Sequence, residues 1–349
     1  MPNLDHLHIF IMAGGSGERF WPLSRTKLPK HLLRLLSDQT LLEMTVRRVE
    51  GLVPWERVFV LTNASQAGAV REELPFLPAE NILVEPEKRD TAPACALATG
   101  FARARDPEAV CALLPADAMI HKVAVFQRQL TQAAVLAAEN DALVTFAIPP
   151  TCASTAFGYL HLGDPMGEAL RVVRFVEKPD LPTAEVYYRS GKYGWNAGMF
   201  LWRASVFLDE VDRLVPELAG FIRDFPAGDP SEFLAARFAA LPKISVDYAV
   251  MEKASEVLAI KAQYDWDDVG SWTALPGHLG HDDDGNTLRG DVVPFAAKNN
   301  VVLSTGRTVA LCGVEDLVVV ETPDAVLVCH RDAVQDIKKL QPLLKESLR

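Results

Sequence analysis

Cysteine is scarce in this chain, and the spacing of the few that occur excludes two kinds of cross-linked site. The 349 residues contain five cysteines, none of which forms a CxxC pair. Structural zinc sites and disulfide frameworks both rely on closely spaced cysteines, so neither is expected. Most of the five lie inside apolar runs such as AVCALL. We therefore expect reduced thiols in the core of a cytoplasmic protein.

The chain also lacks an excess of positive charge and any long apolar run. Its formal net charge is −11, whereas proteins that bind a nucleic-acid backbone normally carry a basic face. No apolar run reaches the roughly 18 residues that a membrane helix needs. The N-terminus lacks the basic start of a secretory signal. Neither nucleic acid nor membrane is expected as a partner, although a local basic pocket for one small anion remains open.

The first 150 residues alternate between two kinds of pattern. Short runs rich in β-branched and apolar residues predict strands, and segments with helical spacing lie between them. The predicted strands are 8–13, 57–62, 81–86, 109–117 and 142–148, and the predicted helices are 40–52, 64–74, 91–105 and 125–140. Such alternation is typical of right-handed βαβ units and a largely parallel sheet.

After residue 150 strands and helices no longer alternate regularly, and the last part of the chain has a different pattern. A hairpin is predicted from two runs, another strand follows, and helices continue to about residue 241; the three strand-like runs are 157–163, 171–179 and 198–203. The polar, glycine-rich stretch 276–290 predicts a linker. Beyond it, four short apolar runs predict a small all-β unit; they are 300–304, 308–313, 317–321 and 325–330. The last segment, 332–348, has the spacing of an amphipathic helix. We expect this C-terminal unit to support assembly or stability and to carry no chemistry.

A glycine-rich loop follows the first predicted strand. Gly14, Gly15 and Gly17 stand in GGSGERF, where the absence of a Cβ lets backbone N–H groups approach an anion. Arg19 and Lys30 would add charge near phosphates. The alternative is a glycine turn flanked by solvated cations. The spacing fits neither GxGxxG nor GxxxxGK[ST], which disfavours an NAD-binding oxidoreductase.

The residues around this loop carry a resemblance. GGSGERFWPLSRTKLPKHLL is similar to the signature GGxGxRhxPLSRxxxPKxhh of sugar-phosphate nucleotidyltransferases, and its WPLSR wording resembles the bacterial mannose-1-phosphate guanylyltransferase family. Seven further segments have counterparts there in the same order. They are VEPEKRDTAPA (84–94), LLPADAMI (113–120), FGYLHLG (157–163), RFVEKPD (174–180), WNAGMFLW (195–202), SVDYAVMEKA (245–254) and WDDVGSW (266–272). The resemblance covers about residues 8–275 and, more weakly, the C-terminal strands.

The resemblance implies a fold and an activity. It implies a Rossmann-like nucleotidyltransferase domain with a mixed, mostly parallel sheet over 1–275, a linker at 276–290, and a small left-handed β-helix-like domain with a C-terminal helix over 291–349. No additional isomerase domain is expected. The implied reaction transfers GMP from GTP to mannose 1-phosphate with Mg²⁺, giving GDP-mannose and pyrophosphate. The implied assembly is a cytoplasmic homodimer.

The resemblance also assigns residues to roles. The implied catalytic residues are Arg19, Lys30, Asp117 and Asp268, and two of these, Asp117 and Asp268, would bind the metal. The implied nucleotide-binding residues are Gly14, Gly15, Gly17, Glu85, Arg89 and Thr91. The implied sugar-phosphate residues are Gly158, Glu177, Lys178, Asn196 and Gly198, with Asp247, Glu252 and Lys253 as further pocket candidates.

Residue chemistry supports parts of this assignment and leaves alternatives open. Two carboxylates plus phosphate oxygens suit Mg²⁺, although Asp117 and Asp268 could instead cap turns, and Asp267 is a neighbouring candidate. One carboxylate at Glu85 can accept from both N1–H and the exocyclic amine of guanine. The alternative for Glu85 is a solvated position in a charged turn.

Two positions depart from the family pattern. Asp90 stands where the family usually has Asn, and Ala118 replaces the usual His after Asp117. A carboxylate near phosphates would repel them unless it faces away or meets metal. Two rival functions therefore stay open. One is a related enzyme using glucose 1-phosphate with UTP or dTTP, and the other is a non-catalytic nucleotide-sugar sensor.

Overall fold

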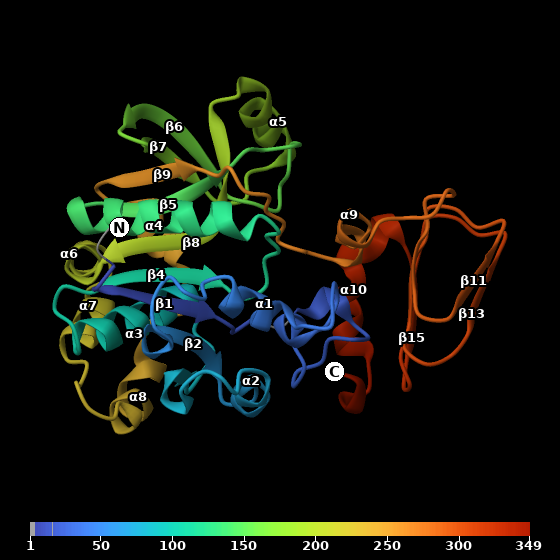
Figure 1. Cartoon of the computed structure of the whole chain (residues 1–349), viewed down its shortest axis with the longest axis horizontal. Helices are drawn as coiled ribbons and strands as arrows, with labels where there is room; N and C mark the ends of the chain where they lie inside the picture. The colour runs from blue at the N-terminus through green and yellow to red at the C-terminus, as the bar shows by residue number, and fades with distance from the viewer. Residues whose placement is uncertain (1–3, 16) are drawn as a thin grey trace.

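The computed structural model describes residues 4–15 and 17–349, and its chain forms two parts that lie side by side in Figure 1. The larger part is an α/β/α sandwich built on one wide sheet. The smaller part is a set of short strands that coil at the C-terminal end. Within the described residues, no helix is long and apolar enough to cross a membrane.

The wide sheet has nine strands in the order β3-β2-β1-β4-β8-β5-β9-β7-β6. β1 pairs in parallel with β2 and β4, β2 with β3, and β5 with β9, whereas β8 runs antiparallel to its neighbours. This confirms the expected mixed, mostly parallel sheet. The bounds are β1 (Leu7–Met12), β2 (Val58–Asn63), β3 (Ile82–Glu85), β4 (Val110–Pro115), β5 (Leu143–Ile148), β6 (Tyr159–Met166), β7 (Ala169–Val176), β8 (Tyr193–Arg203) and β9 (Val257–Lys261).

Successive residues of the central strands enter two separate cores, one on each face of the sheet. In β1, Ile9 and Ile11 point into one core and Phe10 into the other, as the two-residue period of a strand requires. The first core is covered by α1 (Leu41–Arg47), α2 (Ala67–Glu73), α4 (Val123–Glu139) and α5 (Leu181–Ser190). The second is covered by α3 (Thr91–Arg103), α6 (Ala204–Leu214), α7 (Pro216–Arg223) and α8 (Ser231–Arg237). Burial on both faces explains the nearly unbroken apolar runs of these strands.

Several predicted boundaries need correction. α1 ends at Arg47, not at residue 52. Its N-cap forms half of a capping box: the Thr40 hydroxyl accepts from the Glu43 amide at 3.0 Å, but the Glu43 carboxylate binds Arg47. Helix α5 and strand β9 were not predicted. The cap of α5 is visible in the sequence, since the Asp180 carboxylate accepts from the Thr183 amide.

The C-terminal strands form the expected β-helix-like unit. β10, β12 and β14 pair in parallel on one side, β11 and β13 pair in parallel on another, and β15 closes the coil antiparallel to β14. The chain therefore alternates between two sheets from β10 to β14. The bounds are β10 (Thr287–Arg289), β11 (Val292–Phe295), β12 (Val301–Ser304), β13 (Val309–Cys312), β14 (Leu317–Glu321) and β15 (Val326–His330).

Two segments in this region differ from expectation. The stretch expected as a linker contains α9 (Pro276–Leu279) and strand β10. The long helix expected over 332–348 is instead the short α10 (Ile337–Leu340) between 3₁₀ turns. Pro342 lacks the N–H that a continuing helix would use, and it lies in the turn that follows α10.

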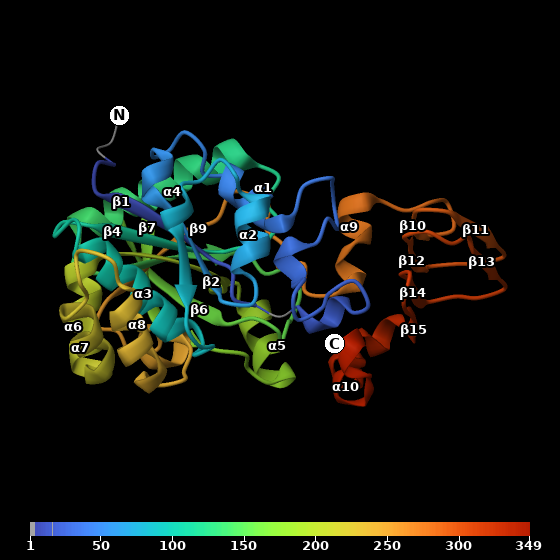
Figure 2. The same ribbon diagram turned by 90° about the horizontal axis from the view of Figure 1, so that it is seen from below.

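The C-terminal segment docks on the loop that follows β1. Val334 and Ile337 are buried in one cluster with Phe20, Trp21 and Trp272. The Trp21 indole N–H donates to the carbonyl of Leu348 at 2.9 Å. Figures 1 and 2 both place α10 between the sandwich and the C-terminal strands, against the early part of the chain. The C-terminal segment thus supports the glycine-rich loop from outside the sandwich.

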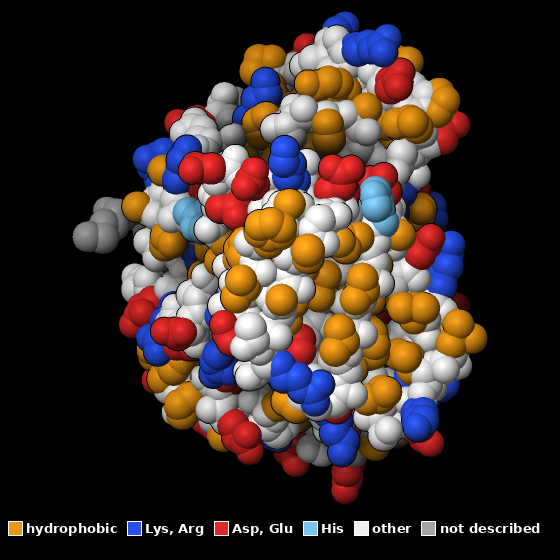
Figure 3. Space-filling view, turned by 90° about the vertical axis from the view of Figure 1, so that its right-hand side faces the viewer, with side chains coloured by type: hydrophobic (Ala, Val, Ile, Leu, Met, Phe, Trp, Pro, Cys, Tyr) orange, Lys and Arg blue, Asp and Glu red, His pale blue; other side chains and the backbone are white. Residues whose placement is uncertain are grey.

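The C-terminal strands leave large apolar side chains exposed. On β11 these are Val293 and Phe295, with Phe295 71% exposed, and on β15 they are Val326 and Val328. Figure 3 views this end of the molecule and shows many hydrophobic side chains on its surface. An exposed apolar surface of this kind is typical of a face that another protein covers.

Candidate active site

The predicted site residues gather at one edge of the sheet. The parallel strands β1, β3 and β4 all end there, and the antiparallel β8 begins there. The glycine-rich loop follows β1, Glu85 ends β3, and Asp117 lies two residues beyond β4. Open α/β sheets bind ligands at this carboxyl edge, where loops can converge without blocking the core.

Lys30 joins the two predicted metal-binding aspartates. Its Nζ donates to the Asp117 carboxylate at 2.9 Å and also to the backbone carbonyl of Asp268. A two-residue bridge holds these distant segments together, because Met119 and Asp267 exchange backbone hydrogen bonds of 2.7 and 3.0 Å. One hollow is lined by Arg19, Lys30, Asp117 and Asp268 together. All four predicted catalytic residues therefore meet.

Gly17 is required by the approach of Lys30. Its φ is +65°, and a Cβ at this position would lie 2.3 Å from Cβ of Lys30, so only glycine fits. At Gly14 and Gly15 an added Cβ would meet nothing within 4 Å. Those two glycines leave open space beside the cleft. A nucleotide would need this space to contact the protein backbone there.

The charges of this cleft are unevenly solvated. Only 9% of the Lys30 side chain is exposed, whereas 42% of the Asp117 side chain faces solvent. Burial raises the pKa of Asp268; Lys30 opposes that rise, and nearby Asp267 and Asp117 add to it. Arg19 reaches the carbonyl of Gly270 at 3.5 Å, and its buried Nε has no partner among the described residues. A cation entering the cleft would offset the charge of the Asp268 carboxylate, and a polyanion could accept a hydrogen bond from Nε of Arg19.

The donor set fits a magnesium ion. Asp117 and Asp268 offer carboxylate oxygens, and burial raises the pKa of Asp268 even though Lys30 lies nearby. Within residues 4–15 and 17–349, no group of three or more His, Cys, Asp or Glu side chains could hold a metal by itself. Mg²⁺ commonly takes one or two carboxylates and completes its shell with water and phosphate. Two neighbouring aspartates supply as many protein carboxylates as this ion commonly takes.

Asp267 has a different task from its neighbour. Its carboxylate accepts from the Val269 amide at 2.7 Å and lies 3.1 Å from Nε2 of His278. Burial opposes ionisation of Asp267, but these two hydrogen bonds prevail and lower its pKa. Asp267 thus shapes the loop that presents Asp268.

Glu85 is buried at the end of β3. The residue is only 8% exposed, and burial raises its pKa to about 7, with Lys88 acting in the opposite direction. No hydrogen bond to its carboxylate is found among the described residues. The alternative of a solvated turn residue is therefore wrong. The neighbouring Pro86 and Lys88 line a second hollow together with Gly14 and Gln66.

The other two predicted nucleotide residues have protein partners. Arg89 donates from Nε to the Glu87 carboxylate at 2.7 Å. The Thr91 hydroxyl accepts from the Val246 amide at 2.8 Å, which fixes the start of the turn at Asp247. Neither residue is among those that line the hollow beside Gly14. The structure therefore gives both side chains partners within the protein.

The two departures from the family pattern have local explanations. Asp90 has φ +69° and its carboxylate accepts from the Thr91 amide at 2.7 Å, capping α3. A negative charge at a helix N-terminus is stabilised by the free amides there, so the Asp90 carboxylate has a local role as the cap of α3. Ala118 is buried and contributes its carbonyl, which accepts from Arg48 at 3.0 Å.

The predicted sugar-phosphate residues form a second cluster. Lys178 donates to the Glu177 carboxylate at 2.8 Å. Asn196 donates to Asp247 at 2.9 Å, and its backbone amide donates to the carbonyl of Gly158 at 2.8 Å. Four separate segments of the chain therefore meet around these polar groups.

Burial and neighbouring charges shift the pKa values of two groups in this second cluster. Burial raises the pKa of Asp247 to about 7, and Glu177 adds to the rise. Burial works against the charged form of Lys178, but the hydrogen bond and charge of Glu177 outweigh it and raise the Lys178 pKa. Lys178 therefore stays a cation. A Cβ at Gly158 would lie 2.4 Å from the Glu177 carboxylate, so a side chain there would displace that carboxylate from its present position.

Some residues around the two hollows were not predicted. Gln66 is buried, and its side-chain oxygen has no partner among the described residues. From the C-terminal segment, Gln341 and Arg349 line the hollow beside Gly14, and Lys338 lines the hollow beside Asp117. Neither periodicity nor motif marks them, because each approaches the site only through the tertiary fold.

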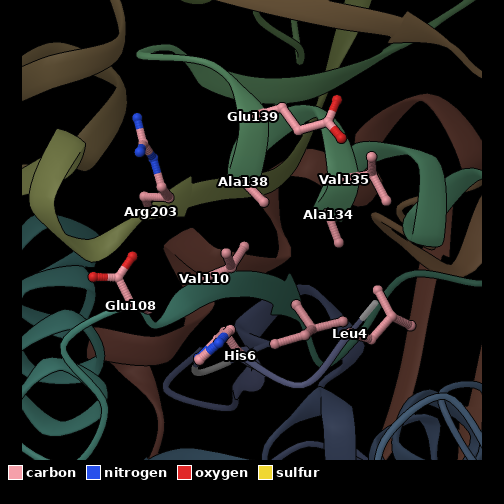
Figure 4. Close-up of a pocket in the computed structure, with 10 residues that line it drawn as sticks. Leu4, His6, Glu108, Val110, Ala134, Val135, Ala138, Glu139 and Arg203 are labelled. Atoms are coloured by element: carbon pink, nitrogen blue, oxygen red, sulfur yellow. The ribbon is translucent and has the colours of Figure 1, made fainter. Parts of the chain in front are cut away.

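Another hollow lies at the opposite edge of the sheet. Figure 4 shows His6 and Val110 near the amino ends of β1 and β4, with Arg203 at the end of β8. Leu4 and Ala134 supply much of its apolar wall. It contains none of the predicted site residues, so it is not part of the candidate active site.

Comparisons with known proteins match both parts of the chain. The family model described as nucleotidyl transferase matches residues 9–279, and the model described as MannoseP isomerase/GMP-like beta-helix domain matches residues 290–342. The chain is 41% identical over 353 residues to the mannose-1-phosphate guanylyltransferase of Escherichia coli (strain K12), covering 97% of this chain and 73% of that protein. It is 40% identical over 346 residues to the xanthan biosynthesis protein XanB of Xanthomonas campestris pv. campestris (strain B100), with the same two coverages of 97% and 73%.

A solved structure is similar along nearly the whole chain. A crystal structure described as mannose-1-phosphate geranyltransferase from Thermus thermophilus superimposes with a TM-score of 0.88 at 34% identity. The match covers 97% of this chain and 99% of that one. The likeness therefore includes both the sandwich and the C-terminal strands.

Proposed function

This chain belongs to the mannose-1-phosphate guanylyltransferase family of nucleotidyltransferases, and we propose that its cleft transfers GMP from GTP to mannose 1-phosphate. The products are GDP-mannose and pyrophosphate. The observation that carries this proposal is the meeting of Arg19, Lys30, Asp117 and Asp268 in one hollow at the carboxyl edge of the sheet. A pyrophosphate-release assay with GTP and mannose 1-phosphate tests it.

In the proposed reaction, a phosphate oxygen of mannose 1-phosphate attacks the α-phosphorus of GTP in line. The bond from the α-phosphorus to the bridging oxygen breaks, and pyrophosphate leaves with that electron pair. The attacking oxygen is already anionic, so no general base is required. The task of the protein is to bring two anions together and to offset their charge.

The cations of the cleft perform that task from fixed positions. Lys30 is held by Asp117 and by the carbonyl of Asp268, so its charge needs little reorganisation when the triphosphate arrives. Arg19 lines the same hollow and has an unpartnered, buried Nε. A Mg²⁺ ion bound by Asp117 and Asp268 would supply further stabilisation of charge on the α-phosphate. We propose Mg²⁺ as the cofactor on the strength of this donor set.

Lys178 is proposed to bind the phosphate of the sugar. It lies in the second cluster with Glu177, Asn196 and Asp247, whose oxygens and amide suit sugar hydroxyls. Lys178 would exchange its bond to Glu177 for one to phosphate and leave Glu177 free to accept from a hydroxyl.

Removing Lys178 should therefore weaken mannose 1-phosphate and spare GTP. A charge-assisted hydrogen bond contributes about 1.5–3 kcal/mol, so Lys178→Ala should raise the KM for mannose 1-phosphate roughly 10- to 150-fold. Initial rates at varied concentrations of each substrate would measure both KM values. The control is Lys192→Ala, at an exposed turn position near the start of β8. A KM that rises only for GTP would contradict the assignment.

Glu85 is proposed to select guanine. Its buried carboxylate has no partner among the described residues, and the next residue, Pro86, lines the hollow that Gly14 and Gln66 also line. An ionised carboxylate can accept from N1–H and from the exocyclic amine at once. ITP lacks that amine, so a site built for both donors discriminates against it.

Replacing Glu85 should reduce the preference for GTP over ITP by about tenfold, since one acceptor is lost. The preference should also depend on pH. Because the pKa of Glu85 is raised to about 7, the carboxylate ionises as pH rises through that value, and the GTP/ITP ratio of kcat/KM should rise with it. Glu85→Gln should flatten this profile, and the exposed neighbour variant Glu87→Gln should not. Equal losses for GTP and ITP in Glu85→Gln would remove the role.

The proposed assembly is a cytoplasmic homodimer. The five cysteines are free thiols, in keeping with a reducing compartment. Only Cys95 and Cys111 are buried, whereas Cys152 and Cys312 are exposed, so the expectation that the thiols lie in the core is wrong for those two. The exposed apolar side chains of β11 and β15, including Phe295 and Val328, offer a surface that a second copy can cover. A monomeric mass in sedimentation equilibrium would contradict the dimer.

A further inference from the structure

Lys338 reaches the catalytic cleft from outside the catalytic domain. It lies on α10 near the end of the chain, yet it lines the same hollow as Arg19, Lys30, Asp117 and Asp268. Neither the glycine-rich loop nor the other family motifs include this part of the chain. Its presence in the hollow is therefore an observation that the motifs of the site do not explain.

The docking of α10 fixes where Lys338 stands. The preceding residue, Ile337, is 2% exposed and packs in the cluster that contains Phe20 and Trp272. Phe20 directly follows Arg19, and Trp272 lies four residues after Asp268. One side of α10 is thus anchored to both loops that carry catalytic residues. A lysine next to this anchor is held near the cleft even though its own side chain is solvated.

Lys338 is available to bind an anion, whereas the neighbouring lysines already have partners. Lys30 is engaged with Asp117 and with the Asp268 carbonyl. The next lysine, Lys339, forms an ion pair with Asp336 at 2.7 Å. Lys338 has no ion pair or side-chain hydrogen bond among the described residues. A triphosphate in this cleft would find Lys338 as an available cation in the same hollow as Lys30.

We propose that Lys338 binds the phosphates of GTP and that the C-terminal unit is thereby part of the nucleotide site. This inference rests on the proposed function, since it takes GTP as the occupant of the cleft. Gln341 and Arg349 of the same segment line the other hollow, beside Gly14 and Gln66, so the segment contributes to both hollows of the proposed nucleotide site. The expectation from sequence that the C-terminal unit carries no chemistry is replaced by this proposal.

The test uses Lys338→Met in the full chain, which removes the charge and keeps most of the apolar stem. Lys339→Met is the matched control, because it removes the adjacent, already paired lysine. Calorimetric titration with GTP, and competition by guanosine, would separate phosphate contacts from base contacts. We expect Lys338→Met to weaken GTP about tenfold, with guanosine affinity, the KM for mannose 1-phosphate and the melting temperature unchanged. Lys338→Arg should restore most of the GTP affinity, and Lys339→Met should resemble the parent.

Other results would overturn the Lys338 inference, the proposed function, or both. Equal GTP affinities for Lys338→Met and Lys339→Met in an active enzyme would overturn the inference alone. An equal loss for guanosine and GTP would also overturn it, because it would show a structural effect on the base site. A parent chain that binds GTP but makes no GDP-mannose would overturn the proposed function and leave the Lys338 contact standing. A parent chain that binds no GTP would overturn both.

Discussion

Asp117→Asn and Asp268→Asn should each lower kcat by roughly a hundredfold or more, the scale of several kcal/mol of transition-state charge stabilisation. Asn keeps the size of Asp and much of its capacity to accept hydrogen bonds, but it lacks the charge that a hard cation prefers. The two residues share one hollow and one lysine. Their effects should therefore be non-additive, and the double variant should be little worse than either single one.

Replacing Asp268 should not lower the stability of the fold, although it lowers kcat. Its pKa is raised in the folded chain, so the ionised carboxylate is disfavoured by folding, and the free energy of unfolding should be larger below that raised pKa than above it. Asp268→Asn removes this charge, and at pH 7 its melting temperature should equal or exceed that of the parent. A fall in kcat without a fall in melting temperature distinguishes a functional charge from a cap.

The neighbouring Asp267 supplies the control for this experiment. Its carboxylate is already used by the Val269 amide and by His278, so Asp267→Asn should affect the loop more than the metal. We expect it to lower the melting temperature and to leave most of kcat intact. Full turnover by Asp117→Asn or Asp268→Asn at ordinary Mg²⁺ concentrations would leave only the turn-capping account of that residue.

Ile337→Asp should separate the C-terminal segment from the catalytic domain. Ile337 is 2% exposed within the cluster of Phe20, Trp21 and Trp272, and burying an unpaired charge there should cost roughly 3–5 kcal/mol. We expect a lower melting temperature, faster proteolysis after residue 290 and a higher KM for GTP, because both Arg19 and Lys338 depend on this docking.

Leu343→Asp is the matched control for that variant. Leu343 lies in the same segment but is 81% exposed, so the charge should change the free energy of unfolding by less than about 0.5 kcal/mol. Unchanged melting temperature and unchanged KM for GTP in Ile337→Asp would show that the packing of α10 does not support the site.

Sequence patterns were most reliable where local periodicity and tertiary burial agree. The five strands from β1 to β5 are nearly all apolar and bounded by turn residues, and each was predicted within a few residues of its observed ends. The segment 332–348 has helical spacing as well, but Ile337 is anchored against Phe20 and Pro342 lies in the following turn. Only one turn of α-helix forms, because the tertiary contacts favour separate short turns.

Local sequence patterns also could not show how the candidate site residues come together. Asp117 and Asp268 were assigned through resemblance, and the structure brings them together through Lys30 and the Met119–Asp267 bridge. No local pattern could reveal that bridge, since its halves lie far apart in the chain. Gly17 was predicted from its motif as a nucleotide-binding residue, and the structure adds a reason that the motif does not show, because a Cβ there would collide with Lys30.

The substrate preference of the cleft can be measured as pyrophosphate release from GTP, ATP, UTP and dTTP, each with mannose 1-phosphate and with glucose 1-phosphate, alongside detection of the nucleotide sugar. We expect the largest kcat/KM for GTP with mannose 1-phosphate, GDP-mannose as the product, and loss of turnover when a chelator removes divalent metal. A larger kcat/KM for UTP or dTTP with glucose 1-phosphate would contradict this expectation. GTP binding without pyrophosphate release under any condition would instead favour a nucleotide-sugar sensor.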